Sequence, residues 1–167
     1  MNQESKQTEV KSYLTFKLGE EKFGVHVGQV LNILEMTSIT RVPKSPDYIK
    51  GVINLRGRVL PVIDARLKFG MEEAEYTNTT CIIVMDLEID RKTIDIGTIV
   101  DEVLSVVEIE TSQVEPPPNI GTKFNSEFIY GMAKVEEEFI MLIDMQHVLN
   151  SEEMTNIAEN SQEESTA

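Results

Sequence analysis

Two stretches of this chain, 80 residues apart, repeat one pattern of apolar strand, turn, apolar strand and aspartate. Residues 51–55 match residues 131–135, and residues 59–64 match residues 139–144 with the same offset. A pattern that occurs twice indicates an internal duplication, whereas a solenoid needs three or more copies. The repeat therefore predicts two related structural units within one chain.

Alternating apolar residues between turn residues predict that both units consist mainly of β-hairpins. We expect four hairpins, turning at residues 19–21, 56–57, 88–91 and 136–138. The spacing of apolar residues over 27–34 predicts one or two turns of helix after the first hairpin, and residues 100–106 repeat that spacing. Asp64 and Asp144 are expected to be the N-caps of two further short helices.

Each half thus contains the strands of a small barrel, so we expect a mainly β fold with two small barrels packed side by side and short helices. The groove between two related barrels is a natural place for a binding site. We expect the folded domain over 12–150. Residues 1–11 and the tail 151–167 are expected to be disordered, because both are polar and the tail carries five glutamates and no cation.

The net charge of −14 opposes a nucleic-acid partner, including for a pair of nucleic-acid-binding barrels. The charge is uneven, because residues 41–68 hold seven cations and two carboxylates, a local charge of +5. This stretch is either a solvated face or an interaction patch for an acidic protein surface, since a local field steers association even against the net charge.

The sequence also indicates a reducing compartment. Cys81 is the single cysteine, lies in an apolar run, and is expected to be an inert core residue. The first residues lack an apolar signal region, and no apolar run approaches the length of a membrane span. We therefore expect a cytoplasmic protein that does not insert into a membrane.

Residues that carry chemistry are sparse. His26 and His147 have no metal ligand at the usual spacing, and the carboxylates of residues 86–90 lack the glycine and closing glutamate of a calcium loop. No glycine-rich phosphate loop or nucleophile-and-base set is recognisable. We expect no cofactor and no enzymatic activity.

One set of motifs resembles the signature of CheW, the bacterial chemotaxis coupling-protein family. The core of the signature is Gly51-Val52-Ile53-Asn54-Leu55-Arg56-Gly57, then Pro61-Val62-Ile63-Asp64-x-Arg66 and Phe69-Gly70. Tyr13-Leu14-Thr15-Phe16, Ile99-Val100-Asp101-x-Val103 and Tyr130-Gly131 also fit, so the likeness runs from about Tyr13 to Leu149. The resemblance implies two SH3-like five-stranded barrels and a stand-alone adaptor. Such adaptors join methyl-accepting chemoreceptors to the regulatory domain of the histidine kinase CheA; this one would be a monomer alone and part of an array when assembled.

The resemblance also implies where the partners bind. The receptor candidates are Val30, Asn32, Ile33, Arg56, Val100 and Val103. The kinase candidates are Ile39, Val42 and Gly51. Many family members have a glutamate at the position of Asn32, and an amide cannot form an ion pair with Arg56. Either Glu35 replaces that carboxylate, if the expected helix continues so far, or Asn32 is simply exposed.

Overall fold

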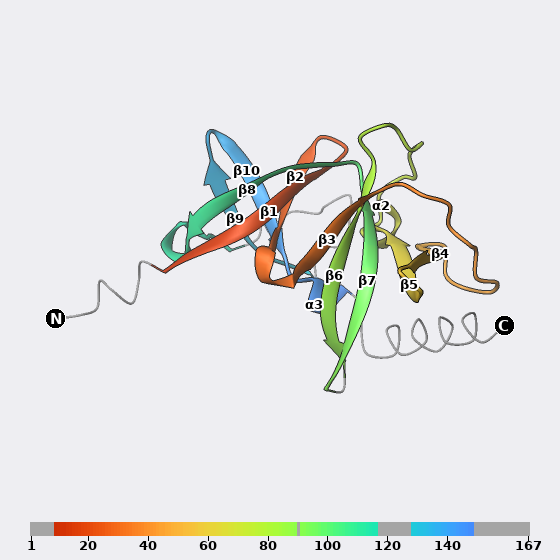
Figure 1. Ribbon diagram of the computed structural model, residues 1–167. Coiled ribbons are helices and arrows are strands. Elements are labelled where there is room, and N and C mark those ends of the chain that lie inside the picture. The colour runs from red at the N-terminus through yellow and green to blue at the C-terminus, as the bar shows by residue number, and fades with distance from the viewer. Residues whose placement is uncertain (1–8, 90, 117–127, 149–167) are drawn as a thin grey trace.

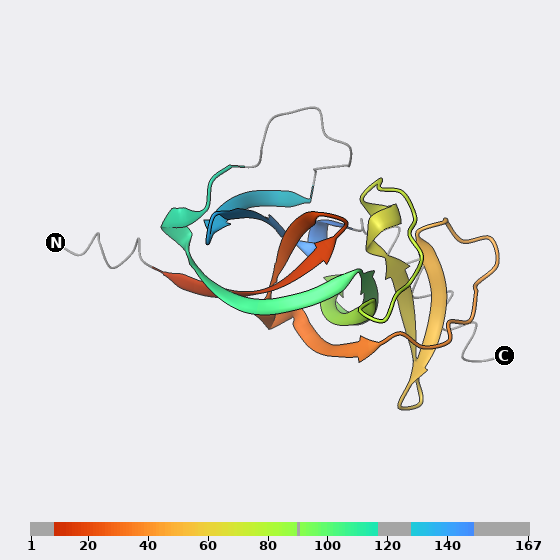
Figure 2. The ribbon, with the colours of Figure 1, turned by 90° about the horizontal axis from the view of Figure 1, so that it is seen from above.

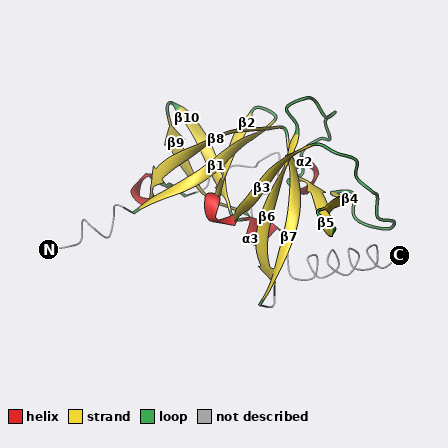
Figure 3. Ribbon diagram, viewed as in Figure 1, coloured by secondary structure: helices red, strands yellow, loops and turns green. Residues whose placement is uncertain are grey.

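The computed structural model describes residues 9–89, 91–116 and 128–148, and it confirms a mainly β fold (Figures 1 and 3). The first half contains β1 (Val10–Leu18), β2 (Glu21–His26), the 3-10 helix η1 (Val27–Gln29), β3 (Val30–Glu35), β4 (Ile49–Leu55), β5 (Arg58–Asp64) and α2 (Ala65–Lys68). The second half contains β6 (Cys81–Ile89), β7 (Lys92–Val100), β8 (Glu102–Glu110), the 3-10 helix η2 (Thr111–Gln113), β9 (Ile129–Val135), β10 (Glu138–Ile143) and α3 (Met145–Val148).

The strands form two five-stranded sheets, and each sheet takes strands from both halves of the chain. The first sheet has the order β8-β1-β2-β10-β9, and the second has the order β3-β6-β7-β5-β4. The two halves have therefore exchanged their leading hairpins, β1–β2 and β6–β7. Hairpins β9–β10 and β4–β5 consequently lie at opposite ends of the molecule (Figure 2).

The duplication persists in three dimensions. Under the duplication, the strands of the first sheet, β8-β1-β2-β10-β9, correspond to β3-β6-β7-β5-β4. This is the strand order of the second sheet. In each sheet a parallel pair joins the halves, with Leu142 opposite Gly24 and Val62 opposite Gly97. A Cβ atom at Gly97 would lie 2.8 Å from the Ile82 side chain, and one at Gly24 would lie 3.2 Å from that of Leu142. Both parallel pairs thus have a glycine where side chains of the sheet interior crowd the backbone.

The expected SH3-like barrels are not confirmed. Within the described residues, the two edge strands of each sheet are not paired with each other, so neither sheet closes. One isolated bridge links each pair of ends, Thr40 with Val52 in the second sheet and Glu115 with Met132 in the first. Each sheet is therefore strongly curved towards closure but keeps open edges.

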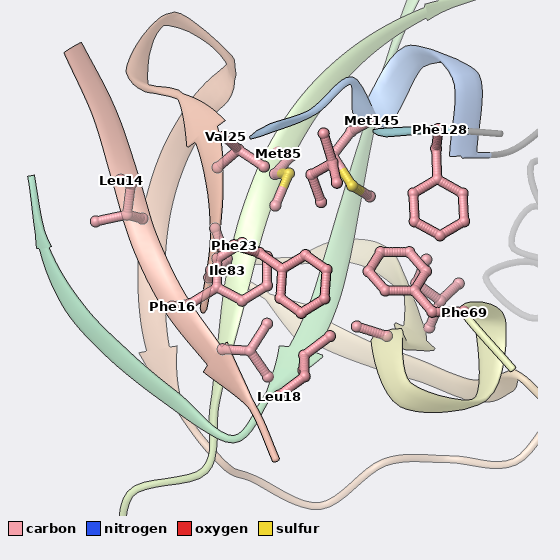
Figure 4. Packing of buried hydrophobic residues seen from close by; sticks show 14 of the residues in the cluster. Leu14, Phe16, Leu18, Phe23, Val25, Phe69, Ile83, Met85, Phe128 and Met145 are labelled. Atoms are coloured by element: carbon pink, nitrogen blue, oxygen red, sulfur yellow. The ribbon is translucent and has the colours of Figure 1, made fainter. Parts of the chain in front are cut away.

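The largest hydrophobic cluster lies between the two sheets and includes four phenylalanines from both halves of the chain. The rings of Phe69 and Phe128 stack with centroids 4.1 Å apart, and Phe23 lies 5.7 Å from Phe69 (Figure 4). Burying each such side chain contributes about 1.5–3 kcal/mol. One smaller cluster belongs to each sheet, around Val62 in the second sheet and around Leu142 in the first. The inter-sheet cluster fixes the two sheets against each other.

The predicted helix over 27–34 is wrong. Only residues 27–29 form a single 3-10 turn, and residues 30–35 form β3, which pairs with β6. The register shifts between Val30 and Asn32, so Leu31 is an extra residue in the strand. Such a bulge breaks the two-residue alternation and imitates helical spacing. Residues 100 and 102–106 likewise lie in β7 and β8, and β8 has a shifted register against β1.

The predicted disorder of residues 1–11 is wrong for residues 10 and 11. β1 begins at Val10, which is opposite Glu110 of β8, and Lys11 is opposite Ile109. These two residues are ordered because the edge strand β8 supplies their hydrogen-bond partners. The rest of that segment (residues 1–8) and the acidic tail 151–167 lie outside the described residues.

Candidate protein-interaction site

The cationic turn of the sequence signature is a tight two-residue hairpin turn between β4 and β5. Arg56 has φ 54° and Gly57 has φ 83°, the left-handed conformations that a type I′ turn requires. The Asn54 side-chain oxygen accepts a hydrogen bond from the Gly57 N–H at 3.0 Å. The side chain of Arg56 is exposed, and no ion pair or hydrogen bond joins it to another described residue. The turn thus presents a guanidinium that pairs with no residue of the described part of the chain.

A cavity of about 280 Å³ lies beside this turn. It is lined by Leu55, Arg56, Arg58, Val59, Leu60, Pro61, Thr93, Ile94 and Asp95. The Arg58 Nη2 atom lies 3.3 Å from the Asp95 Oδ2 atom, although three-quarters of the Arg58 side chain is exposed. An apolar lining with cations at its margin suits contact with another protein.

The receptor candidates on β3 lie on the exposed edge of the second sheet. Val30 is half-buried and packs against the inter-sheet cluster, whereas Asn32 and Ile33 are exposed. The Asn32 side-chain oxygen accepts a hydrogen bond from the Ile33 N–H at 2.8 Å. Leu31 was not among the candidates, but it is 53% exposed beside Ile33 at 44%. Its apolar side chain next to Ile33 was the only signal in the sequence, because the bulge is visible only in the pairing of β3 with β6.

The candidates on β7 and β8 differ in accessibility. Val100 is fully buried, so it offers no surface, whereas Val103 is half-buried against the same inter-sheet cluster as Val30. Val106, farther along β8, is 56% exposed. The structure therefore brings Val30 and Val103 to one cluster.

Arg56 is not joined to the β3 candidates. Among the described residues, it forms no ion pair with Glu35 and no hydrogen bond with Asn32, and the helix that would have carried Glu35 towards it is absent. The suggested replacement of the family's glutamate by Glu35 is thus not present in this structure.

The kinase candidates lie along the segment that crosses from β3 to β4. Ile39 is half-buried against the cluster of the second sheet, and the Val42 carbonyl accepts a hydrogen bond from the Ser45 hydroxyl at 2.8 Å. Gly51 is buried with φ 141°, and a Cβ atom there would lie 2.0 Å from the Thr40 carbonyl oxygen. Gly51 therefore allows two backbones to approach and presents no side chain of its own.

Asp64 begins α2 as predicted. Its side chain accepts a hydrogen bond from the Leu67 N–H at 3.3 Å, as an N-cap does. Burial raises the pKa of this carboxyl, against the opposing effect of hydrogen bonds from the first turn. The Tyr76 hydroxyl also reaches Asp64, at 3.4 Å, and burial raises the pKa of Tyr76 to about 12. These contacts fix the end of β5 and the helix that follows it.

Sequence reasoning missed an ion pair between the two sheets. Arg66 of α2 donates from Nε to Asp101 Oδ1 at 2.9 Å and from Nη2 to Oδ2 at 2.6 Å. Asp101 lies between β7 and β8, and it also accepts the Gly19 N–H from the β1–β2 turn at 2.7 Å. Burial of Asp101 opposes ionisation, but the hydrogen bonds from Arg66 and Gly19 prevail and lower its pKa. Both residues lie in the signature motifs, although 35 residues separate them.

Other chemistry is sparse in residues 9–89, 91–116 and 128–148. No three histidine, cysteine, aspartate or glutamate side chains gather there as a metal ion would require. Burial raises the pKa of the Cys81 thiol, which disfavours its reactive thiolate. No helix in this part of the chain is long and apolar enough to cross a membrane. The prominent features are cations, exposed apolar residues and strand edges, which are groups that bind other proteins.

Comparisons with known proteins agree with the motifs. Residues 12–153 match the family model described as the CheW-like domain. The chain is 36% identical to the chemotaxis protein CheW of Bacillus subtilis over 83% of this chain and 86% of the relative. It is 33% identical to that of Klebsiella aerogenes over 86% and 84%, respectively.

The fold agrees with a solved structure as well. The crystal structure of the scaffolding protein TtCheW from Thermoanaerobacter tengcongensis superposes with a TM-score of 0.77 at 32% identity. The match covers 87% of this chain and 98% of that one. Sequence motifs, family model and fold therefore agree, and the chain belongs to the CheW family.

Proposed function

We propose that this protein is a non-enzymatic adaptor that couples methyl-accepting chemoreceptors to the histidine kinase CheA in chemotaxis signalling. The match of residues 12–153 to the CheW-like domain carries the proposal. The relatives are named chemotaxis proteins, and the similar solved structure is a scaffolding protein. The adaptor works in the cytoplasm, is monomeric alone and becomes part of an array with its partners.

An adaptor needs at least two separate surfaces on a rigid body, so that binding at one biases events at the other. The cationic turn at Arg56 and the exposed edge of β3 would form one such surface, and the segment of Ile39 and Val42 between β3 and β4 would form the other. The inter-sheet cluster and the Arg66–Asp101 pair hold the two sheets together. These features support a coupling role.

For the receptor surface we retain Arg56, the β3 residues Val30, Asn32 and Ile33, and Val103, which packs against the same cluster as Val30. Val100 would act only by supporting the cluster, because it is buried. A planar guanidinium binds carboxylates or carbonyls through two hydrogen bonds at once. An exposed ion pair contributes only about 0–1 kcal/mol, so exposed apolar residues such as Ile33 must supply much of the affinity.

For the kinase surface we retain the segment of Ile39 and Val42, which would contact the regulatory domain of CheA. Gly51 would act indirectly, by allowing the segment around Thr40 to pair with Val52 through two backbone hydrogen bonds of 2.8 Å.

Arg56→Ala tests the receptor surface. We expect weaker co-sedimentation with receptor-containing membranes and unchanged folding, because Arg56 bonds to no described residue. A melting temperature lowered by more than about 5 °C would instead make Arg56 structural. Unchanged receptor binding would remove Arg56 from the surface.

Reconstitution with CheA and receptor tests the coupling role itself. Receptor control of CheA autophosphorylation should require this protein in a concentration-dependent way. Kinase control that is the same with and without the protein would refute the proposed function.

A further inference from the structure

The two parallel strand pairs that join the halves contain three residue pairs each, but these pairs lie at different positions along the duplicated strands. In the first sheet, β10 and β2 pair from Ile140–Lys22 to Leu142–Gly24. In the second sheet, β5 and β7 pair only from Val62–Gly97 onwards. The counterpart of the Ile140–Lys22 pair would be Leu60 with Asp95, and these residues are not paired. The second sheet is thus open between β5 and β7 at the end nearest the cationic turn; we call this gap the open seam.

Pro61 contributes to the open seam, because it has no N–H to donate to β7, whereas its counterpart Met141 in β10 has one and is paired with Phe23. β2 begins at Glu21, directly before the residues that pair with β10. β7 begins at Lys92, well before Gly97, where its pairing with β5 begins. In the first sheet, Lys22 and Glu138 form an ion pair across the corresponding position, where the two strands are paired. In the second sheet, the exposed Arg58–Asp95 contact is the matching ion pair, and the 280 Å³ cavity lies there.

Each wall of the open seam is a strand with one free edge. Residues 58–61 of β5 pair only with β4, and residues 93–95 of β7 pair only with β6. Unpaired N–H and C=O groups along a strand edge bind an added extended strand. The β7 wall suits this better, because Pro61 in the β5 wall has no N–H to donate. Leu55, Val59 and Ile94 add apolar surface to the lining.

The charges at the open seam favour an acidic occupant. Arg56 and Arg58 both line the cavity, and Asp95 is the one carboxylate among the lining residues. Arg56 has no ion-pair partner among the described residues, and Arg58 is three-quarters exposed despite its contact with Asp95. In a chain of net charge −14, this is a locally positive site next to free backbone groups.

We propose that the open seam binds an extended acidic segment of a partner protein. The segment pairs its backbone with the free edge of β7 at Thr93–Asp95 and places its carboxylates against Arg56 and Arg58. This inference goes beyond the coupling role and does not depend on it, because neither a receptor nor a kinase is needed to observe the binding.

A labelled peptide tests the inference on the full chain. The probe is fluorescein-Gly-Glu-Val-Glu-Val-Glu-Gly-amide, and binding is followed by fluorescence anisotropy at low ionic strength. We expect saturable binding that Arg58→Glu weakens by about tenfold or more. Lys22→Glu is the matched control, because it makes the same charge change at the closed seam, and it should leave the affinity within about twofold.

Two further measurements separate strand pairing from simple charge attraction. A probe with proline in place of its central glutamate lacks one backbone donor and should bind at least about tenfold more weakly than a probe with glutamine there, which loses the same charge. Amide NMR signals of Thr93–Asp95 should shift on addition of the original probe. The proposal is overturned by an absence of saturable binding, by equal losses for Arg58→Glu and Lys22→Glu, or by equal affinity of the proline and glutamine probes. Loss of receptor or kinase coupling with intact peptide binding would reject the proposed function alone.

Discussion

Asp101 is the residue that most directly connects the two sheets by polar contacts. It accepts hydrogen bonds from Arg66 after β5 and from the Gly19 N–H between β1 and β2. The pair is partly shielded, with 19% of the Arg66 side chain and 31% of the Asp101 side chain exposed. Partial shielding makes a charge-assisted hydrogen bond stronger than one on an open surface.

The lowered pKa of Asp101 makes its contribution to stability dependent on pH. Because the folded pKa lies below the unfolded value of about 3.9, the contribution is fully present above that value and is lost as pH falls through the folded pKa. Asp101→Asn should lower the free energy of unfolding by about 1–2 kcal/mol at pH 7. Urea unfolding of the wild type and of Asp101→Asn at neutral and strongly acidic pH would measure the free energy of unfolding with Asp101 ionised and with Asp101 protonated.

The difference between wild type and Asp101→Asn should shrink on acidification, because protonated Asp101 resembles asparagine. Asp47→Asn, at an exposed loop carboxylate, is the control and should change stability little at either pH. A difference for Asp101→Asn that stays constant across the pH range would show that packing, not ionisation, is responsible.

For single residues, the sequence predicts the contacts that a residue makes with near neighbours along the chain. The Asp64 cap was foreseeable, because its partner Leu67 is three residues away. The Arg56–Gly57 turn was foreseeable for the same reason. The Arg66–Asp101 pair and the contact of Gly51 with Thr40 were not, because each depends on how distant strands are placed.

Among the elements, the hairpins were predictable from alternation and the edge strands were not. All four hairpins occur, since two-residue alternation and turn residues are local signals. The bulge at Leu31 inserts an extra residue into β3, so its apolar residues follow a helix-like spacing although the strand pairs with β6. A bulge is defined by the partner strand, and the sequence alone does not reveal that partner.

The two hairpin turns related by the duplication differ in backbone strain. Glu136 and Glu137 have φ values of 51° and 72°, where their counterparts are Arg56 and Gly57. A side chain in the left-handed conformation costs about 1–2 kcal/mol, and glycine avoids this cost. Glu137→Gly should therefore raise the free energy of unfolding by about 0.5–1 kcal/mol and the melting temperature by a few degrees, as calorimetry can measure.

The duplication supplies the control for this prediction. Gly57→Glu introduces at the first turn the residue that Glu137→Gly removes from the second, so it should lower the melting temperature. The exposed Lys134–Glu137 contact of 3.8 Å is lost in Glu137→Gly, but its contribution is small. A lower melting temperature for Glu137→Gly would show that this contact outweighs the backbone strain.

For the whole molecule, the repeat predicted two related units but not the exchange of hairpins between them. Alternation indicates that a segment is a strand and which side faces the interior, but not which strand it pairs with. In this chain β2 pairs with β10 and β7 pairs with β5, so each sheet is completed only when both halves are present. The exchange also explains why one large cluster contains Phe16, Phe69 and Phe128 from both halves.

The exchange predicts that neither half folds alone. Residues 1–78 would lack β6, β8 and β10, the partners of β3, β1 and β2, and residues 79–167 would lack the corresponding strands. Each fragment should give a disordered circular dichroism spectrum, and an equimolar mixture should recover the spectrum and the amide NMR dispersion of the full chain. The control is the full chain cut at Asn78 by an engineered protease site, which should remain folded because the loop of residues 71–80 contains no helix or strand. A cooperative thermal transition in either isolated fragment would mean that one half can build its own sheet, and the exchanged pairing would then not be required for folding.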